Sequence, residues 1–126
     1  MLPGQTASGD INPSRFVTKS GAFTVAQAGA GAVAIGISHE GSKTAPIPGA
    51  SSLAASAGDP LAVYGDTEAC LLEAGAAYAA GAYLKPDSTG RGITAASTEK
   101  YSAIAEQAAA AAGVKVIVNV KAGVAP

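Results

Sequence analysis

The chain contains no tryptophan, one cysteine and one histidine, and aromatic residues occupy only 5% of its 126 positions. A single cysteine excludes an intrachain disulfide, and with it a small secreted fold stapled by disulfides. The scarcity of aromatics removes the bulky side chains that usually dominate a core or a binding hot spot. In their place stand 31 alanines and 16 glycines. A core of small aliphatic side chains buries little apolar area per residue, so we expect an oligomer or a domain that docks onto a larger surface.

Charge is sparse as well, because charged residues make up 13% of the chain and the formal net charge is −1. Lysine and arginine are scattered without a run, which argues against nucleic acid as a partner. The N-terminus has no basic segment followed by an apolar one, so we expect no signal peptide. No apolar run approaches the ~20 residues that span a bilayer. We therefore expect a soluble protein that engages neither nucleic acid nor membrane.

The chain divides into two parts by composition. Residues 1–14 carry two prolines, two glycines and several small polar residues, which predicts an extended N-terminal arm. Leu2 and Ile11 are its large apolar side chains besides Met1. Residues 15–126 are predicted to form a single β-rich domain.

Short alternating apolar runs bounded by Gly, Pro and Asp predict strands throughout the second part. One hairpin is predicted to join residues 15–18 to 23–26, and another to join 61–64 to 69–72 through the turn at 65–68. The remaining predicted strands are 33–38, 83–85, 93–97, 101–105 and 114–120. A weak internal echo relates the first hairpin and the run after it to residues 83–104, which suggests a repeated architecture.

Two segments do not read as strands. Residues 39–57 are predicted to be a long irregular loop with one helical turn near 51–55. Five consecutive alanines ahead of Gly113 predict a short helix over residues 106–112. The expected fold class is therefore mainly β, a small β-barrel or β-sandwich with one short Ala-rich helix and the extended arm.

The only histidine, His39, lies between Ser38 and Glu40. Neighbours in an extended chain point to opposite faces, so these three side chains cannot stack as a catalytic triad. We expect His39 to be a solvated loop residue. No spacing of His, Cys, Asp and Glu matches a metal site.

Other local patterns are interpreted as chance or structural features. Residues 97–100 match the S-x-x-K pattern, but its companion motifs are missing. The glycines at 29–31 lack the strand and long helix of a dinucleotide loop. Cys70 is expected to be a small buried hydrophobe, and the turn carboxylates are expected to cap backbone amides: Asp59, Asp66, Glu68 and Asp87. We predict no catalytic residue, no cofactor-binding or metal-binding residue, and no cofactor.

A set of small-residue motifs follows in a characteristic order from about residue 11 to residue 121. The motifs are Arg15-Phe16-Val17, Ala34-Ile35-Gly36-Ile37-Ser38, Gly58-Asp59-Pro60-Leu61-Ala62-Val63, Ala74-Gly75-Ala76-Ala77, Gly81-Ala82-Tyr83-Leu84 with Asp87, Gly90 and Arg91, the Ala-rich turn ending at Gly113, and the final β-branched strand. In this order the chain resembles the small capsid cement, or head decoration, proteins of tailed bacteriophages. The loop at 41–56 is long for that pattern.

The resemblance implies a β-tulip-like fold and a non-enzymatic structural protein of the virion. Such a protein binds the outer surface of the assembled head, commonly as a homotrimer, and cements the lattice of the major capsid protein. From the composition of the arm we hypothesise that Leu2, Ile11 and Arg15 contact the capsid, with Arg15 as a charged anchor.

Two other functions remain as alternatives. A carbohydrate- or cell-surface-binding β module displayed on a virion would need aromatic platforms, for which four tyrosines and two phenylalanines are available. A small hydrolase would have to depend on His39.

Overall fold

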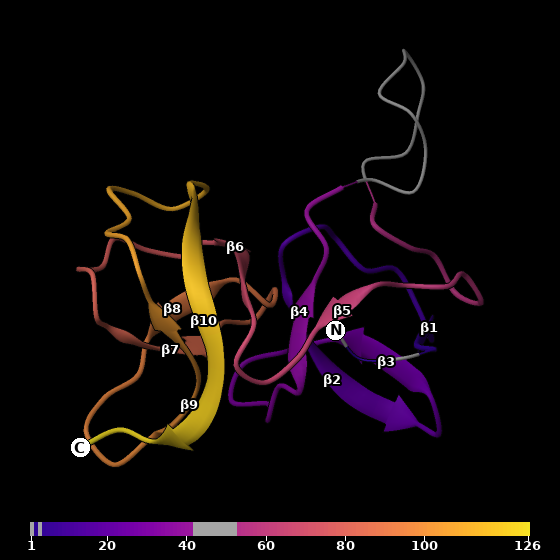
Figure 1. Ribbon diagram of the computed structural model, residues 1–126, viewed down its shortest axis with the longest axis horizontal. Coiled ribbons are helices and arrows are strands. Elements are labelled where there is room, and N and C mark those ends of the chain that lie inside the picture. Colours follow the sequence, from indigo (N-terminus) through magenta and orange to yellow (C-terminus); the bar gives the residue numbers. More distant parts are fainter. Residues whose placement is uncertain (1, 3, 42–52) are drawn as a thin grey trace.

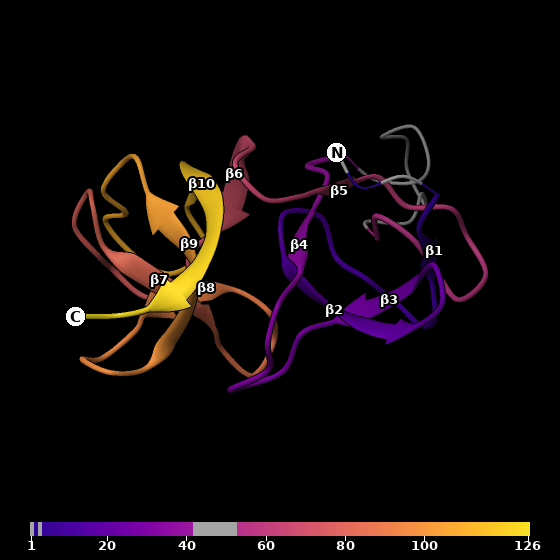
Figure 2. The same cartoon turned by 60° about the horizontal axis from the view of Figure 1, so that its bottom comes forward.

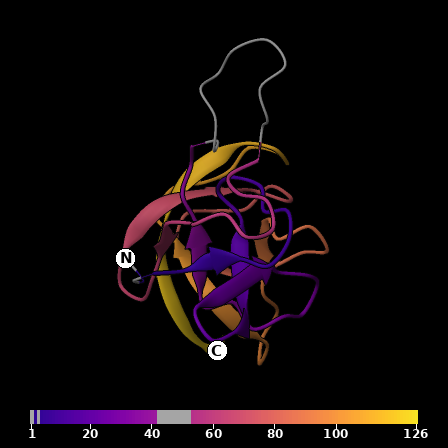
Figure 3. The same cartoon turned by 90° about the vertical axis from the view of Figure 1, so that its right-hand side faces the viewer.

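The computed structural model describes residues 2, 4–41 and 53–126, and these residues form two five-stranded β-sheets (Figure 1). We call the sheet of β1 to β5 the N-terminal sheet and the sheet of β6 to β10 the C-terminal sheet. The two sheets lie side by side in Figure 1, and the view along the long axis places the N-terminal sheet in front (Figure 3). The predicted mainly-β fold is confirmed.

The N-terminal sheet has the strand order β1-β3-β2-β4-β5. Its strands are β1 (Thr6–Ala7), β2 (Phe16–Gly21), β3 (Thr24–Gln27), β4 (Gly36–Ser38) and β5 (Val63–Tyr64). β1 is parallel to β3, and the other neighbours are antiparallel. The hairpin of β2 and β3 confirms the first predicted hairpin.

The C-terminal sheet has the order β6-β10-β9-β7-β8, with antiparallel neighbours. Its strands are β6 (Ala69–Glu73), β7 (Tyr83–Pro86), β8 (Gly92–Thr94), β9 (Lys100–Ala105) and β10 (Lys115–Val124). The long strand β10 curves along this sheet (Figure 2). Strands were predicted at all five positions, because each has the alternating or β-branched pattern of a half-buried strand.

The second predicted hairpin, residues 61–64 with 69–72, is wrong. β5 pairs with β4 through Ile37 and Tyr64, whereas β6 pairs with β10 through Cys70 and Val118. The turn at 65–68 therefore carries the chain from one sheet to the other. It does form a turn, in which the amide of Gly65 donates to the Glu68 carboxylate at 2.8 Å.

The short Ala-rich helix predicted over residues 106–112 is not formed. Ala109 is buried and exchanges two backbone hydrogen bonds with Tyr78, at 2.9 and 3.1 Å. These bonds take the backbone groups that a helix would use internally. A seven-residue segment is too short to be a stable helix without strong tertiary support, and here the tertiary contacts favour an irregular loop.

The N-terminal segment that we expected to extend as an arm lies along the N-terminal sheet. Thr6 and Ala7 pair with β3, Leu2 bridges to Val63, and Ile11 bridges to Ala55. The sequence of this segment has little intrinsic preference for a helix or a strand. It is held in place because Leu2, Ala7 and Ile11 pack in the core of the N-terminal sheet. Of the helical turn predicted near residues 51–55, residues 51 and 52 lie outside the described residues. Residues 53–55 are not helical, because Ala55 forms a β-bridge with Ile11 instead.

Two clusters of buried side chains form the core. One lies within the N-terminal sheet and includes Ile11, Val17 and Val25. The other joins the sheets, since Phe16 and Ile37 pack in the same cluster as residues of β6 to β10. The two sheets therefore share a core, which fixes their mutual position.

Candidate docking surface

The three residues predicted to contact a capsid occupy different environments. Leu2 is half-buried against the core of the N-terminal sheet. Ile11 is fully buried in that core. Arg15 lies at the junction of the two sheets, so the fold does not bring the three side chains together on one exposed face.

Arg15 is held by groups of the C-terminal sheet. Its Nη1 donates to the carbonyl of Thr89 at 2.9 Å, and its Nη2 donates to the Glu73 carboxylate at 3.1 Å. Arg91 lies 3.8 Å from the same carboxylate and 3.5 Å from that of Asp87. The pKa of Asp87 is lowered although burial raises it, because amides of Thr89 and Arg91 donate to its carboxylate. This network holds the sheets together.

The residues around His39 do not form a nucleophilic site. Ser38 is fully buried, and its Oγ donates to the carbonyl of Asn12 at 2.8 Å and accepts from the Arg15 amide at 3.1 Å. His39 Nδ1 accepts a hydrogen bond from the amide of Gly41. The Glu40 carboxylate accepts from the Tyr64 hydroxyl. Each polar group is thus engaged with the fold and not with a neighbour in a triad.

Two buried groups have strongly raised pKa values. Burial raises the pKa of the Cys70 thiol to about 12, with Glu40 and Glu68 adding to the effect. Burial raises the pKa of Tyr78 to about 12 as well, and its hydroxyl has no hydrogen-bond partner among the described residues. A thiol held in its neutral form is a poor nucleophile, so Cys70 serves as a core residue.

A groove with a volume of about 540 Å³ separates the β3–β4 connection from the end of β10. Its lining residues are Gly31, Ala32, Val33, Lys85, Glu99, Lys100, Tyr101, Ser102, Ala122, Gly123 and Val124. Val33 and Val124 stand out because they are 60% and 59% exposed. We call this feature the β10 groove. It combines apolar walls with a few charged groups, as binding surfaces commonly do.

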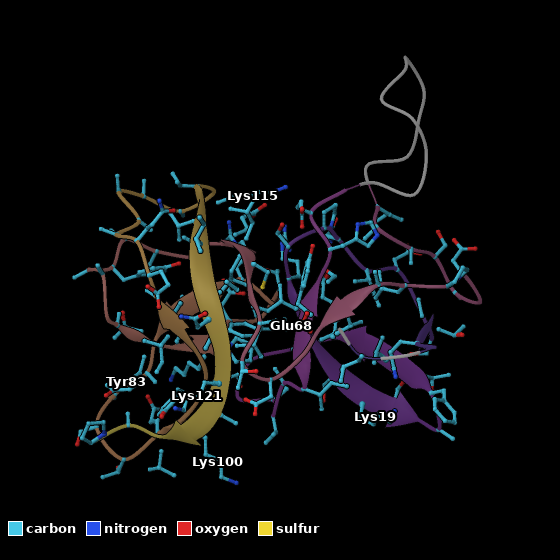
Figure 4. The ribbon with its side chains drawn as sticks, in the orientation of Figure 1. Lys19, Glu68, Tyr83, Lys100, Lys115 and Lys121 are labelled. Carbon is cyan, nitrogen blue, oxygen red and sulfur yellow. The ribbon has the colours of Figure 1, made fainter. Side chains whose placement is uncertain are left out.

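The charged groups of the β10 groove are unbalanced. Lys85 and Glu99 form an ion pair at 2.8 Å. Lys100 makes no ion pair with any residue in the described part of the chain. Figure 4 shows Lys100 and Lys121 near the same end of β10, with Tyr83 beside them. This end of the molecule therefore carries a positive excess.

Tyr101 contributes an aromatic ring to the groove and packs against Tyr83, with ring centroids 4.6 Å apart. A Cβ added at Gly123 would lie 2.6 Å from the Tyr101 ring, so this ring also lies against the backbone of β10. A sugar platform needs an open aromatic face, whereas this ring contacts the Tyr83 ring and lies close to Gly123. The ring pair gives no support to the carbohydrate-binding alternative.

Sequence reasoning missed the β10 groove. The alternation at 33–38 placed Val33 on one face with Ile35 and Ile37, yet Ile37 is buried and Val33 is exposed. β4 begins only at Gly36, so Val33 belongs to the preceding loop. The sequence does not show that Val33 and Val124 are exposed, and only the fold brings these two residues together.

Residues 2, 4–41 and 53–126 hold no group of three or more His, Cys, Asp and Glu side chains placed to bind a metal ion. In the same part of the chain, no helix is long and apolar enough to cross a membrane.

The described residues thus form a mainly-β protein of two sheets with a groove beside the end of β10. No family model matches the chain, and no curated protein matches it. Its fold is similar to a solved structure described as the head fiber gp8.5 N base in bacteriophage phi29. The TM-score is 0.57 with 17% sequence identity, and the match covers 93% of this chain and 90% of that one. The likeness shows a shared fold over nearly the whole length of both chains.

Proposed function

We propose that this chain is a non-enzymatic structural protein of a bacteriophage virion that attaches to the outer surface of the assembled head. The observation that carries the proposal is the fold likeness to a head fiber base over 93% of the chain. The order of motifs that resembles head decoration proteins points to the same class of protein. Fold alone does not define function, so the proposal needs a direct test.

The chemistry of the described residues agrees with a structural role. The polar groups with the strongest catalytic potential are used within the fold: Ser38 in backbone hydrogen bonds, Cys70 in the core, and Glu73 between two arginines. We propose the major capsid protein as the partner and a homotrimer as the working form. Repetition over a lattice would turn modest contacts into strong attachment.

Co-sedimentation with assembled heads that lack their decoration tests the attachment. We expect saturable binding at a fixed ratio to the shell subunit, together with a trimer mass for the free protein. A folded protein that fails to sediment with matched, expanded heads would contradict the attachment role.

Cementing and simple anchoring are separate proposals within this role. A cement protein raises the temperature at which heads rupture, because it binds the intact lattice and not the dissociated subunits. We propose cementing, and expect saturated heads to release their DNA at a higher temperature than bare heads. Binding without any shift in the rupture temperature would leave the chain as an anchor for another component.

A further inference from the structure

The β10 groove borders a section of β10 that has a partner strand on one side only. β6 pairs with β10 from Lys115 to Asn119, while β9 pairs with it as far as Val124. On the β6 side, the carbonyl of Val120 accepts a hydrogen bond from the amide of Thr67 at 2.7 Å. The amide of Val120 donates to the carbonyl of Glu68 at 2.9 Å. From residue 121 to residue 124 the described chain places no strand on that side.

The backbone of Val124 faces this open side. Ala125 donates its amide to the carbonyl of Glu99 and accepts from the amide of Thr98, both at 2.8 Å, so its backbone groups point toward β9. Successive residues of a strand direct these groups to opposite sides. The amide and carbonyl of Val124 therefore point away from β9, where a further strand could pair with them.

The groove next to this edge offers an apolar surface. Val33 lies on the wall formed by the β3–β4 connection and Val124 on the wall formed by β10, and both are more than half exposed. The small residues Ala32 and Ala122 lie beside them. An aliphatic side chain inserted between the two valines would bury apolar surface that water now covers.

The charges indicate what else the occupant carries. Lys85 is neutralised by Glu99, whereas Lys100 makes no ion pair with a described residue, and Lys121 stands next to the lining residue Ala122. A ligand with an acidic side chain near its aliphatic anchor would balance this charge and associate faster.

We infer that the β10 groove binds an extended segment of a partner protein, added as a strand to the edge at residues 121–124. The segment places an aliphatic side chain between Val33 and Val124 and an acidic side chain toward Lys100. Strand addition supplies main-chain hydrogen bonds, and the side-chain pockets supply specificity. The inference deepens the proposed function and rests on it for the identity of the partner, which would be the head shell protein.

Two variants remove different parts of the interaction. Lys100→Glu reverses the charge of the groove. Val124→Pro removes the outward amide, and the preceding Gly123 tolerates the backbone restriction that proline imposes. Lys19→Glu is the matched control, because Lys19 is an exposed lysine on the β2–β3 hairpin, away from the groove (Figure 4).

The first experiment selects binders for the wild-type protein from a display library of random linear peptides. We expect enriched peptides in which aliphatic residues alternate with Asp or Glu. Their affinity should fall about tenfold, equivalent to ~1.4 kcal/mol, in each groove variant and stay unchanged in Lys19→Glu. Selection of no peptide, or of peptides that bind all variants equally, would overturn the inference.

The second experiment repeats head co-sedimentation with the same variants, after circular dichroism confirms that each is folded. Loss of binding in both groove variants and not in the control supports the inference. If the wild type binds heads and the groove variants bind equally well, the inference fails while the proposed function stands. If the wild type binds no heads, the proposed function fails, and the peptide selection alone decides whether the groove binds an extended segment.

If instead both groove variants convert an oligomer to a monomer, the occupant is a second copy of this chain, and the inference of a foreign partner is wrong.

Discussion

Arg15 Nη2 lies 3.1 Å from Glu73 Oε2, and this ion pair connects the residue before β2 to the last residue of β6. Both side chains are mostly buried, and Arg91 approaches the same carboxylate. Glu73 thus balances two guanidinium groups at the junction of the sheets. Arg15, which the sequence predicted to contact a capsid, is therefore paired with groups of its own fold.

Glu73→Gln should destabilise the protein, because it removes the carboxylate that pairs with the mostly buried Arg15 and leaves Arg91 with Asp87 alone. We expect the free energy of unfolding in urea to fall by about 1–2 kcal/mol. Glu99→Gln is the control, since it breaks an ion pair whose partners are more exposed and should cost less. Equal losses for the two variants would show that the junction does not depend on this pairing.

Gly90 should be more sensitive to substitution than Gly113, although both have φ near the left-handed region, at +80° and +90°. A Cβ at Gly90 would lie 3.1 Å from the carbonyl oxygen of Phe16, whose amide is bonded to Gly90 itself. A Cβ at Gly113 would meet nothing within 4 Å. We expect Gly113→Ala to cost about 1 kcal/mol from the backbone alone and Gly90→Ala clearly more. Paired thermal and urea unfolding curves measure the difference, and indistinguishable curves would contradict it.

Local patterns predicted the strands well and their partners less well. The β-branched alternation at 114–120 predicts one buried face. Val116, Val118 and Val120 do lie in the core, whereas Val114 precedes β10 and is 39% exposed. The turn residues at 65–68 form a turn, but turn chemistry fixes only the local backbone. The choice of partner strand depends on long-range packing, which placed Tyr64 beside Ile37 and Cys70 beside Val118 in different sheets.

The weak internal echo has a structural counterpart. β2 lies between β3 and β4, and β7 lies between β8 and β9, with antiparallel pairing in both cases. The segments that match in sequence lie in or just before these strands. The β10 groove had no such local signal, because its lining comes from four separate segments that only the assembled sheets bring together.

The protein should lose stability in alkali through Cys70 and Tyr78. Their ordinary pKa values are 9.0 and 10.0, and burial raises each to about 12 in the folded state. The unfolded chain releases these protons first, so their contribution to stability is complete below pH 9. It then falls as the pH rises toward 12, by about 1.4 kcal/mol per pH unit for each group above its ordinary pKa.

Urea unfolding at several pH values between 8 and about 12 measures this loss. The double variant Cys70→Ala, Tyr78→Phe should show a shallower decline than the wild type, whatever its stability at neutral pH. Tyr78→Phe alone should not weaken the protein at pH 7, since the buried hydroxyl has no partner among the described residues. A double variant with the wild-type slope would assign the alkaline loss to other groups.

Ile11→Ala should unfold the N-terminal sheet more readily than Leu2→Ala, because Ile11 is fully buried while Leu2 is half-buried. A large-to-small change in a packed core costs about 2–5 kcal/mol, and truncation of a half-exposed side chain costs less.

Deleting residues 1–14 would also remove β1 and the bridge from Ile11 to Ala55, so a loss of head binding in that deletion could reflect unfolding. Leu2→Ala therefore tests the predicted capsid contact more directly. We expect it to stay folded by circular dichroism and to bind heads less tightly in co-sedimentation. Full binding by this variant would remove Leu2 from the contact surface, and an Ile11→Ala protein as stable as the wild type would contradict the position of Ile11 in the core.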